Sequence, residues 1–194
     1  MSEAYSDLKT RIEQSITVSN LWLSVEENIL KMSRLKSEIL DTLLNDRRLF
    51  FMGNGGSAAE ASHLAAEFVG KCRLDSDPYP AICLNDSITS ITAIANDWEF
   101  AESFSRQVRA HCRKGDLVIG LSTSGSKNVV DALRLAMKQG CKVWLFTSEK
   151  NKNLGFFGES EIVAPTLITS IAQELHLQIG HAIVESLELE NYSK

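Results

Sequence analysis

The chain has 194 residues, of which 44% are hydrophobic and 23% are charged, and this composition is typical of a globular domain. Its net charge of -5 argues against bulk binding of nucleic acid. No apolar run approaches the roughly 20 residues of a membrane-spanning helix, and the polar start MSEAYSDLKTRIEQ does not resemble a signal peptide. The cysteines lack metal-site spacing, so we expect reduced thiols in a cytoplasmic protein. They are Cys72, Cys83, Cys112 and Cys141.

Residues 1–46 show the periodicity of two helices. Apolar residues recur there at spacings of three and four, which is typical of a helix with one buried face. They include Ile29, Met32, Leu35, Ile39 and Leu43. The spacing predicts a break near residues 26–28. We expect these helices to serve packing or contacts between subunits.

Residues 47–194 alternate short apolar runs with helical patterns. The runs RRLFFMG, PAICLN, DLVIGLS, CKVWLFTS and EIVAPT predict strands, and the last helix is predicted over SIAQELHLQIGHAIVESLELE. Strands that are apolar throughout and separated by helices indicate a parallel sheet of the α/β class. Residues 1–194 contain no linker or repeat, so a single domain is expected. Ligands of such sheets bind beyond the carboxyl ends of the strands.

The turn GNGGS at residues 53–57 follows the first predicted strand and opens a helix. Glycines allow backbone N–H groups to approach a ligand closely. The turn is neither a GxGxxG motif nor a P-loop with its lysine, so nucleotide binding has little support. Ser57 and Glu60 have the spacing of a helix-capping box. A ligand site and a simple capped turn therefore both remain open at this point.

A second polar turn follows the strand DLVIGLS. Its hydroxyl side chains precede a predicted helix, where free backbone N–H groups and the helix dipole favour an anion. They are Ser122, Thr123, Ser124 and Ser126. Capping alone is the alternative, but four hydroxyls within five residues favour a phosphate site. Lys127 is the one positive side chain of this turn, which suits a phosphomonoester held by dipoles and hydroxyls.

Titratable side chains lie on two of the predicted helices. His63 and Glu67, four residues apart, share one helical face and could hold one ion or one substrate. On the last helix His181 lies about 80° around and ~12 Å along the axis from Gln173. A pocket shared by both would have to span two turns, and His176 points to the other side of Gln173. Asn96 and Asp97 are expected in a loop, either as an Asx cap or as ligand contacts.

The motifs GNGGSAAEASHLAAE, AIANDWEF, SFSRQV, GLSTSGS and QELHLQIGH occur in this order. In this pattern the chain resembles the SIS (sugar isomerase) family over about residues 12–188. It is similar in particular to members that interconvert sedoheptulose 7-phosphate and D-glycero-D-manno-heptose 7-phosphate through an enediol. The resemblance implies a three-layer αβα sandwich, with the N-terminal helices assembling a homotetramer whose active sites lie between subunits.

The resemblance also implies roles for individual residues. Glu67 and His181 would be the acid–base pair, and one zinc ion per subunit would be bound by His63, Glu67, Gln173 and His181. The phosphate would be held by Ser122, Thr123, Ser124 and Ser126. The rest of the substrate would contact Asn54, Gly55, Gly56, Ser57, Glu67, Asn96, Asp97 and Gln173.

Two departures from the family pattern affect the substrate end. The phosphate loop STSGSKNVV is one residue shorter, and Thr169, Ser170 and Ile171 replace a segment that usually carries charged side chains. An isomerase of another sugar phosphate is therefore an alternative. Others are a non-catalytic tetrameric member that binds the bacterial replication initiator and a phosphosugar sensor. Neither of these needs the pair Glu67 and His181, so its presence favours the enzyme.

Overall fold

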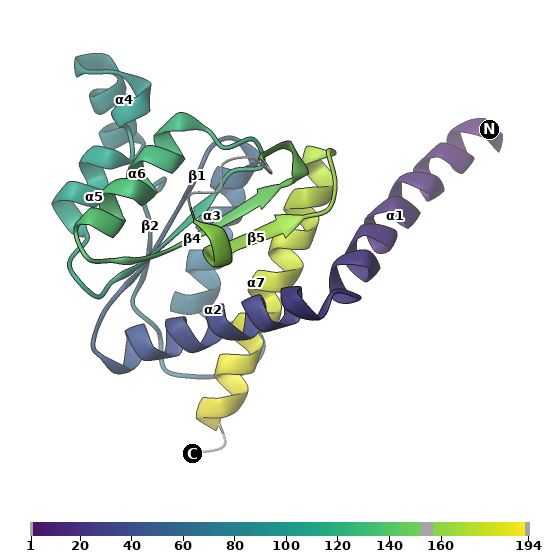
Figure 1. Cartoon of the computed structure of the whole chain (residues 1–194), viewed down its shortest axis with the longest axis horizontal. Helices are drawn as coiled ribbons and strands as arrows, with labels where there is room; N and C mark the ends of the chain where they lie inside the picture. Colours follow the sequence, from purple (N-terminus) through teal and green to yellow (C-terminus); the bar gives the residue numbers. More distant parts are fainter. Residues whose placement is uncertain (1, 152–156, 193–194) are drawn as a thin grey trace.

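The computed structural model (Figure 1) describes residues 2–151 and 157–192. Within them, a five-stranded parallel sheet has the order β2-β1-β3-β4-β5. The strands are β1 (Leu49–Gly53), β2 (Ala81–Cys83), β3 (Leu117–Leu121), β4 (Lys142–Ser148) and β5 (Glu161–Ala164). The near-continuous apolar runs are buried on both faces, as the sequence predicts for parallel strands.

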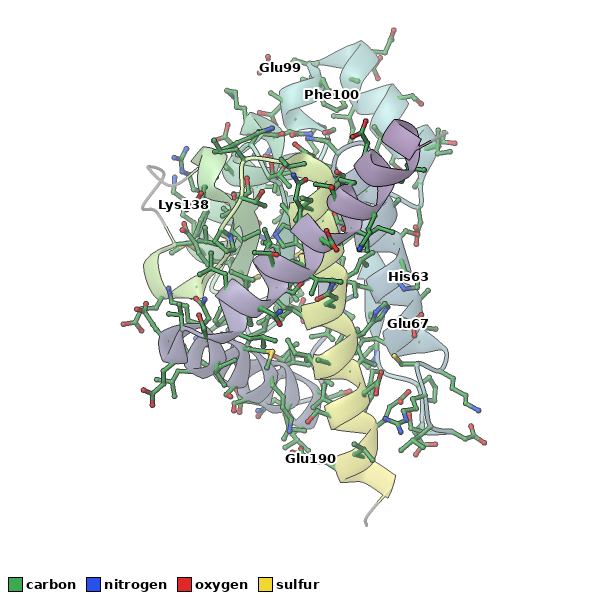
Figure 2. All side chains as sticks on the ribbon, turned by 90° about the vertical axis from the view of Figure 1, so that its right-hand side faces the viewer. His63, Glu67, Glu99, Phe100, Lys138 and Glu190 are labelled. Carbon is green, nitrogen blue, oxygen red and sulfur yellow. The ribbon has the colours of Figure 1, made fainter. Side chains whose placement is uncertain are left out.

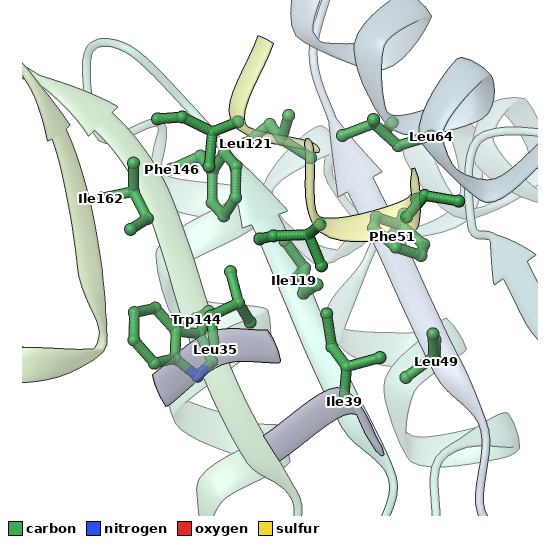
Figure 3. Packing of buried hydrophobic residues seen from close by; sticks show 14 of the residues in the cluster. Leu35, Ile39, Leu49, Phe51, Leu64, Ile119, Leu121, Trp144, Phe146 and Ile162 are labelled. Carbon is green, nitrogen blue, oxygen red and sulfur yellow. The ribbon is translucent and has the colours of Figure 1, made fainter. Parts of the chain in front are cut away.

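Helices cover both faces of the sheet. One face is covered by α2 (Glu26–Leu44), α3 (Gly56–Val69) and α7 (Thr169–Tyr192), which pack on it with the side chains of Figure 3. The other is covered by α5 (Ser105–His111) and α6 (Lys127–Lys138). Successive residues of a strand point to opposite faces, so Phe51 joins the first cluster and Phe50 the second. The αβα sandwich expected from the resemblance is therefore confirmed.

The remaining elements lie at the edges of this sandwich. They are α1 (Ser2–Leu23), α4 (Ile88–Asp97) and the short 3-10 helices η1 (Phe100–Glu102), η2 (Glu149–Asn151) and η3 (Gly158–Ser160). The break between α1 and α2 falls at residues 24–25, slightly before the predicted 26–28. Trp22 is buried at the end of α1, and the extended backbone of Val25 starts α2 at Glu26. None of the helices described combines the length and hydropathy that crossing a membrane requires.

Helices α3 and α7 lie side by side and run in the same direction. Ser57 contacts Gln173, Leu64 contacts Gly180, and Glu188 binds the backbone just beyond α3, always across 116 residues of sequence. Gly180 allows the close approach, because a Cβ atom there would overlap the side chain of Leu64. The two helices thus present their side chains to one another in a fixed register.

Candidate active site

The glycine turn leaves β1 and enters α3 without a side-chain cap. Gly55 is the N-cap with a φ of 55°, which is a left-handed conformation that favours glycine. The helix begins at Gly56, so Ser57 lies inside its first turn and the predicted capping box of Ser57 and Glu60 is wrong. Ser57 instead accepts a hydrogen bond from Gln173, and Glu60 faces His176.

His63, Glu67 and His181 form the cluster in which zinc binding was expected. Nε2 of His63 lies 2.7 Å from Nε2 of His181 and 3.4 Å from Oε1 of Glu67. One donor atom from each of the three residues lies within 4.8 Å of the other two. Figure 2 shows His63 and Glu67 on the same side of α3. His63 is exposed and the other two are partly buried, so a ligand can reach the cluster.

Gln173, the other residue of the expected zinc set, lies over the glycine turn. Its Nε2 donates a hydrogen bond of 3.2 Å to Ser57 Oγ. A Cβ atom added at Gly56 would lie 2.6 Å from the same nitrogen, so the absence of a side chain at Gly56 makes room for this amide. The structure therefore places Gln173 at the start of α3, whereas His63 and Glu67 follow one to three turns later.

The serine turn after β3 is held by hydrogen bonds within the turn and from β4. Ser122 Oγ accepts a hydrogen bond from the N–H of Ser126, and the carbonyl of Ser122 accepts one from Thr147 Oγ1. Thr123 is also buried and its carbonyl is bound by Ser148, whereas Ser124 is exposed. The hydroxyl of Ser122 and the carbonyl of Thr123 therefore help to hold the turn in shape.

The positive charge of Lys127 is engaged with a neighbouring carboxylate. Its Nζ lies 2.9 Å from Asp131 Oδ2, and this hydrogen-bonded pair raises the pKa of the lysine. What the turn can still offer to a ligand is its hydroxyl groups and the beginning of α6, and the phosphate site stays a prediction.

Asparagine side chains join the two turns. Gly53 and Leu121, the last residues of β1 and β3, are partners in the sheet. Just beyond them, the amides of Asn54 and Asn128 donate to each other at 2.7 and 3.0 Å, and Asn128 also donates to Ser103 Oγ. Asn128, which the sequence analysis missed, could have been noticed as an amide at the start of a helix beside the serine turn.

Asn96 and Asp97 are the last residues of α4, so the predicted loop is wrong at this place. The apolar residues before them pack Ile94 into the interior and continue the helix to Asp97. Both residues are exposed, and Asn96 donates a hydrogen bond to Asp97 Oδ1 at 3.0 Å. They are held beside η1, where α4 packs.

Comparison with known proteins assigns this architecture to a family. The model of the SIS domain matches residues 16–148. The chain therefore belongs to the SIS-domain family. In this chain the domain is built on the parallel sheet, with a polar turn after β1 and another after β3.

Relatives of the chain in sequence and in structure carry the name phosphoheptose isomerase. The chain is 37% identical over 187 residues to a phosphoheptose isomerase of Thermodesulfovibrio yellowstonii, covering 96% of this chain and 92% of the relative. It is 40% identical over 159 residues to that of Citrifermentans bemidjiense, with 81% and 83% covered. The solved phosphoheptose isomerase of Neisseria gonorrhoeae superposes with a TM-score of 0.86 at 30% identity, covering 95% of this chain and 98% of the other.

Proposed function

We propose that this sugar-phosphate isomerase converts sedoheptulose 7-phosphate into D-glycero-D-manno-heptose 7-phosphate through an enediol. The convergence of His63, Glu67 and His181, two of them on the helix that follows the glycine turn, supports the proposal most directly. The relatives named phosphoheptose isomerase support the choice of a seven-carbon sugar.

The donor set fits a zinc ion. Zinc in catalytic sites is bound by imidazole nitrogens and carboxylate oxygens, commonly by three protein ligands with one position left open. His63, Glu67 and His181 offer this set from two packed helices. We propose that they hold one zinc per subunit. Gln173 remains the proposed fourth ligand, because an amide binds a metal through its oxygen, and its Nε2 can keep the hydrogen bond to Ser57. When bound, zinc would polarise the substrate carbonyl and stabilise negative charge on its oxygen.

The protein's own side chains would then move the protons. Aldose–ketose isomerisation needs a base that takes a proton from the carbon beside the carbonyl and returns it to the neighbouring carbon. Glu67 has two carboxylate oxygens, so one can face His63 while the other performs this transfer. His181 would move the second proton between O1 and O2, because the ring nitrogens of an imidazole can both donate and accept a proton.

The serine turn would hold the other end of the substrate. Ser124 is the exposed hydroxyl of the turn, and the first N–H groups of α6 lie behind it. Helix N-termini favour phosphate through these free donors and the helix dipole. Asn54, Gly55 and Gly56 would line the path between the phosphate and the metal. Asn96 and Asp97 remain proposed substrate contacts.

We also propose that the protein works as a homotetramer in the cytoplasm. Leu8, Ile12 and Ile16 form an exposed apolar row on α1, which projects from the sandwich (Figure 1). Such a row is expected to pack against another copy. The cysteines within the described residues are unpaired, which suits a reducing compartment.

The assembly can be tested with Ile12→Asp, which should give a smaller species in light scattering. Met137→Asp, at an exposed site on α6 outside the N-terminal helices, should leave the mass unchanged. An Ile12→Asp variant with the mass of the unmodified protein would contradict the role of α1.

The activity can be tested by NMR with purified protein, sedoheptulose 7-phosphate and deuterated buffer, with and without added zinc. Exchange of a C1 proton and the appearance of the aldose phosphate are expected. Exchange or isomerisation seen only with another sugar phosphate would keep the enzyme class and change the substrate. Binding of sugar phosphate without exchange in any of them would favour a sensor or scaffold instead.

A further inference from the structure

A buried acid–histidine pair lies between α3 and α7 outside the proposed zinc and substrate residues. Nδ1 of His176 is 3.3 Å from Oε1 of Glu60. Only 4% of Glu60 and 0% of His176 are exposed, and the ring of His176 packs edge-on against Phe146. Such groups are costly to bury, so their presence in the core needs a physical reason.

The protonation of His176 is partly fixed by its other neighbour. Nε2 of the ring lies 2.9 Å from the carbonyl oxygen of Thr147, which can only accept a hydrogen bond. Nε2 must therefore carry a hydrogen, and Nδ1 faces the carboxyl group. Among the described residues, Nδ1 and both oxygens of Glu60 make no hydrogen bond, so the 3.3 Å approach of Nδ1 to Oε1 is the polar contact that these two buried atoms have. The two groups are thus each other's polar partner inside the protein.

Along the interface of α3 and α7, the pair lies between the contact of Gln173 with Ser57 and the contact of His181 with His63. One turn before it Gln173 meets Ser57, and about one turn after it His181 meets His63. Thr147, whose carbonyl binds His176, donates its own hydroxyl to the carbonyl of Ser122 in the serine turn. The pair therefore links α3, which carries Glu60, to α7, which carries His176, and His176 also joins α7 to β4 through Thr147.

A buried acid–histidine pair is weak evidence for stability, since two apolar side chains of similar volume often stabilise a fold equally well. Its advantage is directional, because a carboxylate and an imidazole bind in few orientations, whereas apolar side chains tolerate a shift of the helices. At this interface a shift along the axis would separate His181 from His63 and Glu67.

We propose that Glu60 and His176 are positioning residues that set the register of α7 against α3, so that His181 meets His63 and Glu67 at one metal ion. This inference rests on the zinc site of the proposed function and adds two residues that contact neither metal nor substrate. It predicts that a variant without the pair binds zinc more weakly than a control variant that has lost a similar amount of folding stability.

The test compares zinc affinity in three variants by competition with a chromogenic chelator. Glu60→Gln and His176→Gln break the pair. Asp116→Asn is the matched control, a buried carboxylate outside α3 and α7 that accepts hydrogen bonds from the backbone N–H groups of Arg48 and Arg113. Changes around metal ligands cost about 10–100-fold in affinity, so at least a tenfold rise in Kd is expected for the first two variants. Asp116→Asn should lower the melting temperature and leave the zinc Kd unchanged.

Unchanged zinc affinity in Glu60→Gln and His176→Gln, with a lower melting temperature, would overturn the proposal and leave the pair a purely structural contact. Should the single variants not fold, the apolar double variant Glu60→Met/His176→Leu replaces them. Weaker zinc binding by that folded double variant supports the proposal, and unchanged binding overturns it.

Failure of the zinc proposal itself would be recognised separately, because the unmodified protein would then bind no zinc. In that case, the position of α7 relative to α3 is monitored by NMR through the imidazole nitrogen resonances of His63 and His181. A changed tautomer or exchange pattern of these rings in Glu60→Gln would support positioning by the pair. Identical spectra in the variant and the unmodified protein would overturn it.

Discussion

Nε2 of His63 lies 2.7 Å from Nε2 of His181, although 118 residues separate the two histidines in the sequence. One ring comes from the helix that follows the first strand and the other from the last helix of the chain. Their contact turns a single-helix motif, His63 with Glu67, into a set of three donors. The proposed chemistry depends on this convergence, and the predictions below test its parts.

Glu67→Gln should lower kcat by about 10²–10⁴-fold, the usual contribution of a general base. The amide has nearly the same shape but cannot take the proton. The matched control is Glu185→Gln, a carboxylate on α7 that is paired with Arg73. Isotope exchange at C1 of the substrate gives the direct measurement. Normal exchange in Glu67→Gln would remove this residue as the base.

Ser124→Ala should raise KM by about 10-fold or more with little change in kcat, because a hydrogen bond to a charged group contributes roughly 1.5–3 kcal/mol. Ser122→Ala should act differently, since its hydroxyl holds the N–H of Ser126, and should also lower the melting temperature. Ser37→Ala, on the outer face of α2, serves as the control. Equal KM values for Ser124→Ala and the unmodified enzyme would place the phosphate elsewhere.

Gly56→Ala should disturb the site through Gln173. The added Cβ would lie 2.6 Å from Gln173 Nε2, and the flexible amide can move aside, so the effect on stability should be small. Turnover or substrate binding should fall because the amide leaves its place. In a double-mutant cycle, Gly56→Ala should add little in the background of Gln173→Ala. Additive effects of the two changes would mean that Gly56 acts on the substrate directly.

Acid stability should depend on Glu188. Burial acts to raise the pKa of this carboxyl group, but hydrogen bonds from the N–H groups of residues 72–74 and the charge of Lys71 outweigh it and leave the pKa lowered. A carboxylate with a lowered folded-state pKa stabilises the fold above its unfolded pKa, about 4.3, and this stability is lost as the pH falls through the folded value.

The melting temperature of Glu188→Gln should therefore fall furthest below that of the unmodified protein above about pH 5. Loss of a charged hydrogen-bond acceptor costs roughly 1.5–3 kcal/mol, and each kcal/mol shifts the melting temperature by about 2–4 °C in a chain of this size. The difference should shrink in more acidic buffer. A gap that stays constant from pH 7 to pH 3 would contradict the ionised role of Glu188.

The strands and most helices were predicted well from local sequence patterns. Such patterns depend only on which nearby residues are apolar and on which residues form the turns. Errors arose where neighbouring segments decide the outcome. Ser57 was predicted to be the helix cap, but Gly55, with its positive φ, is the N-cap and α3 begins at Gly56. Asn96 and Asp97 looked like a loop, yet packing of Ile94 continues α4 through them.

The sequence by itself determined the class of the protein, through apolar strands that alternate with helices, two polar turns at strand ends, and a histidine four residues before a glutamate. The tertiary structure alone decided which of the distant side chains meet. Gln173, His176 and His181 follow one another on one helix, and periodicity cannot tell which neighbour each will face. Gly180 allows α7 to pack closely on α3 at Leu64, and in the observed register His181 meets His63 and His176 faces Glu60.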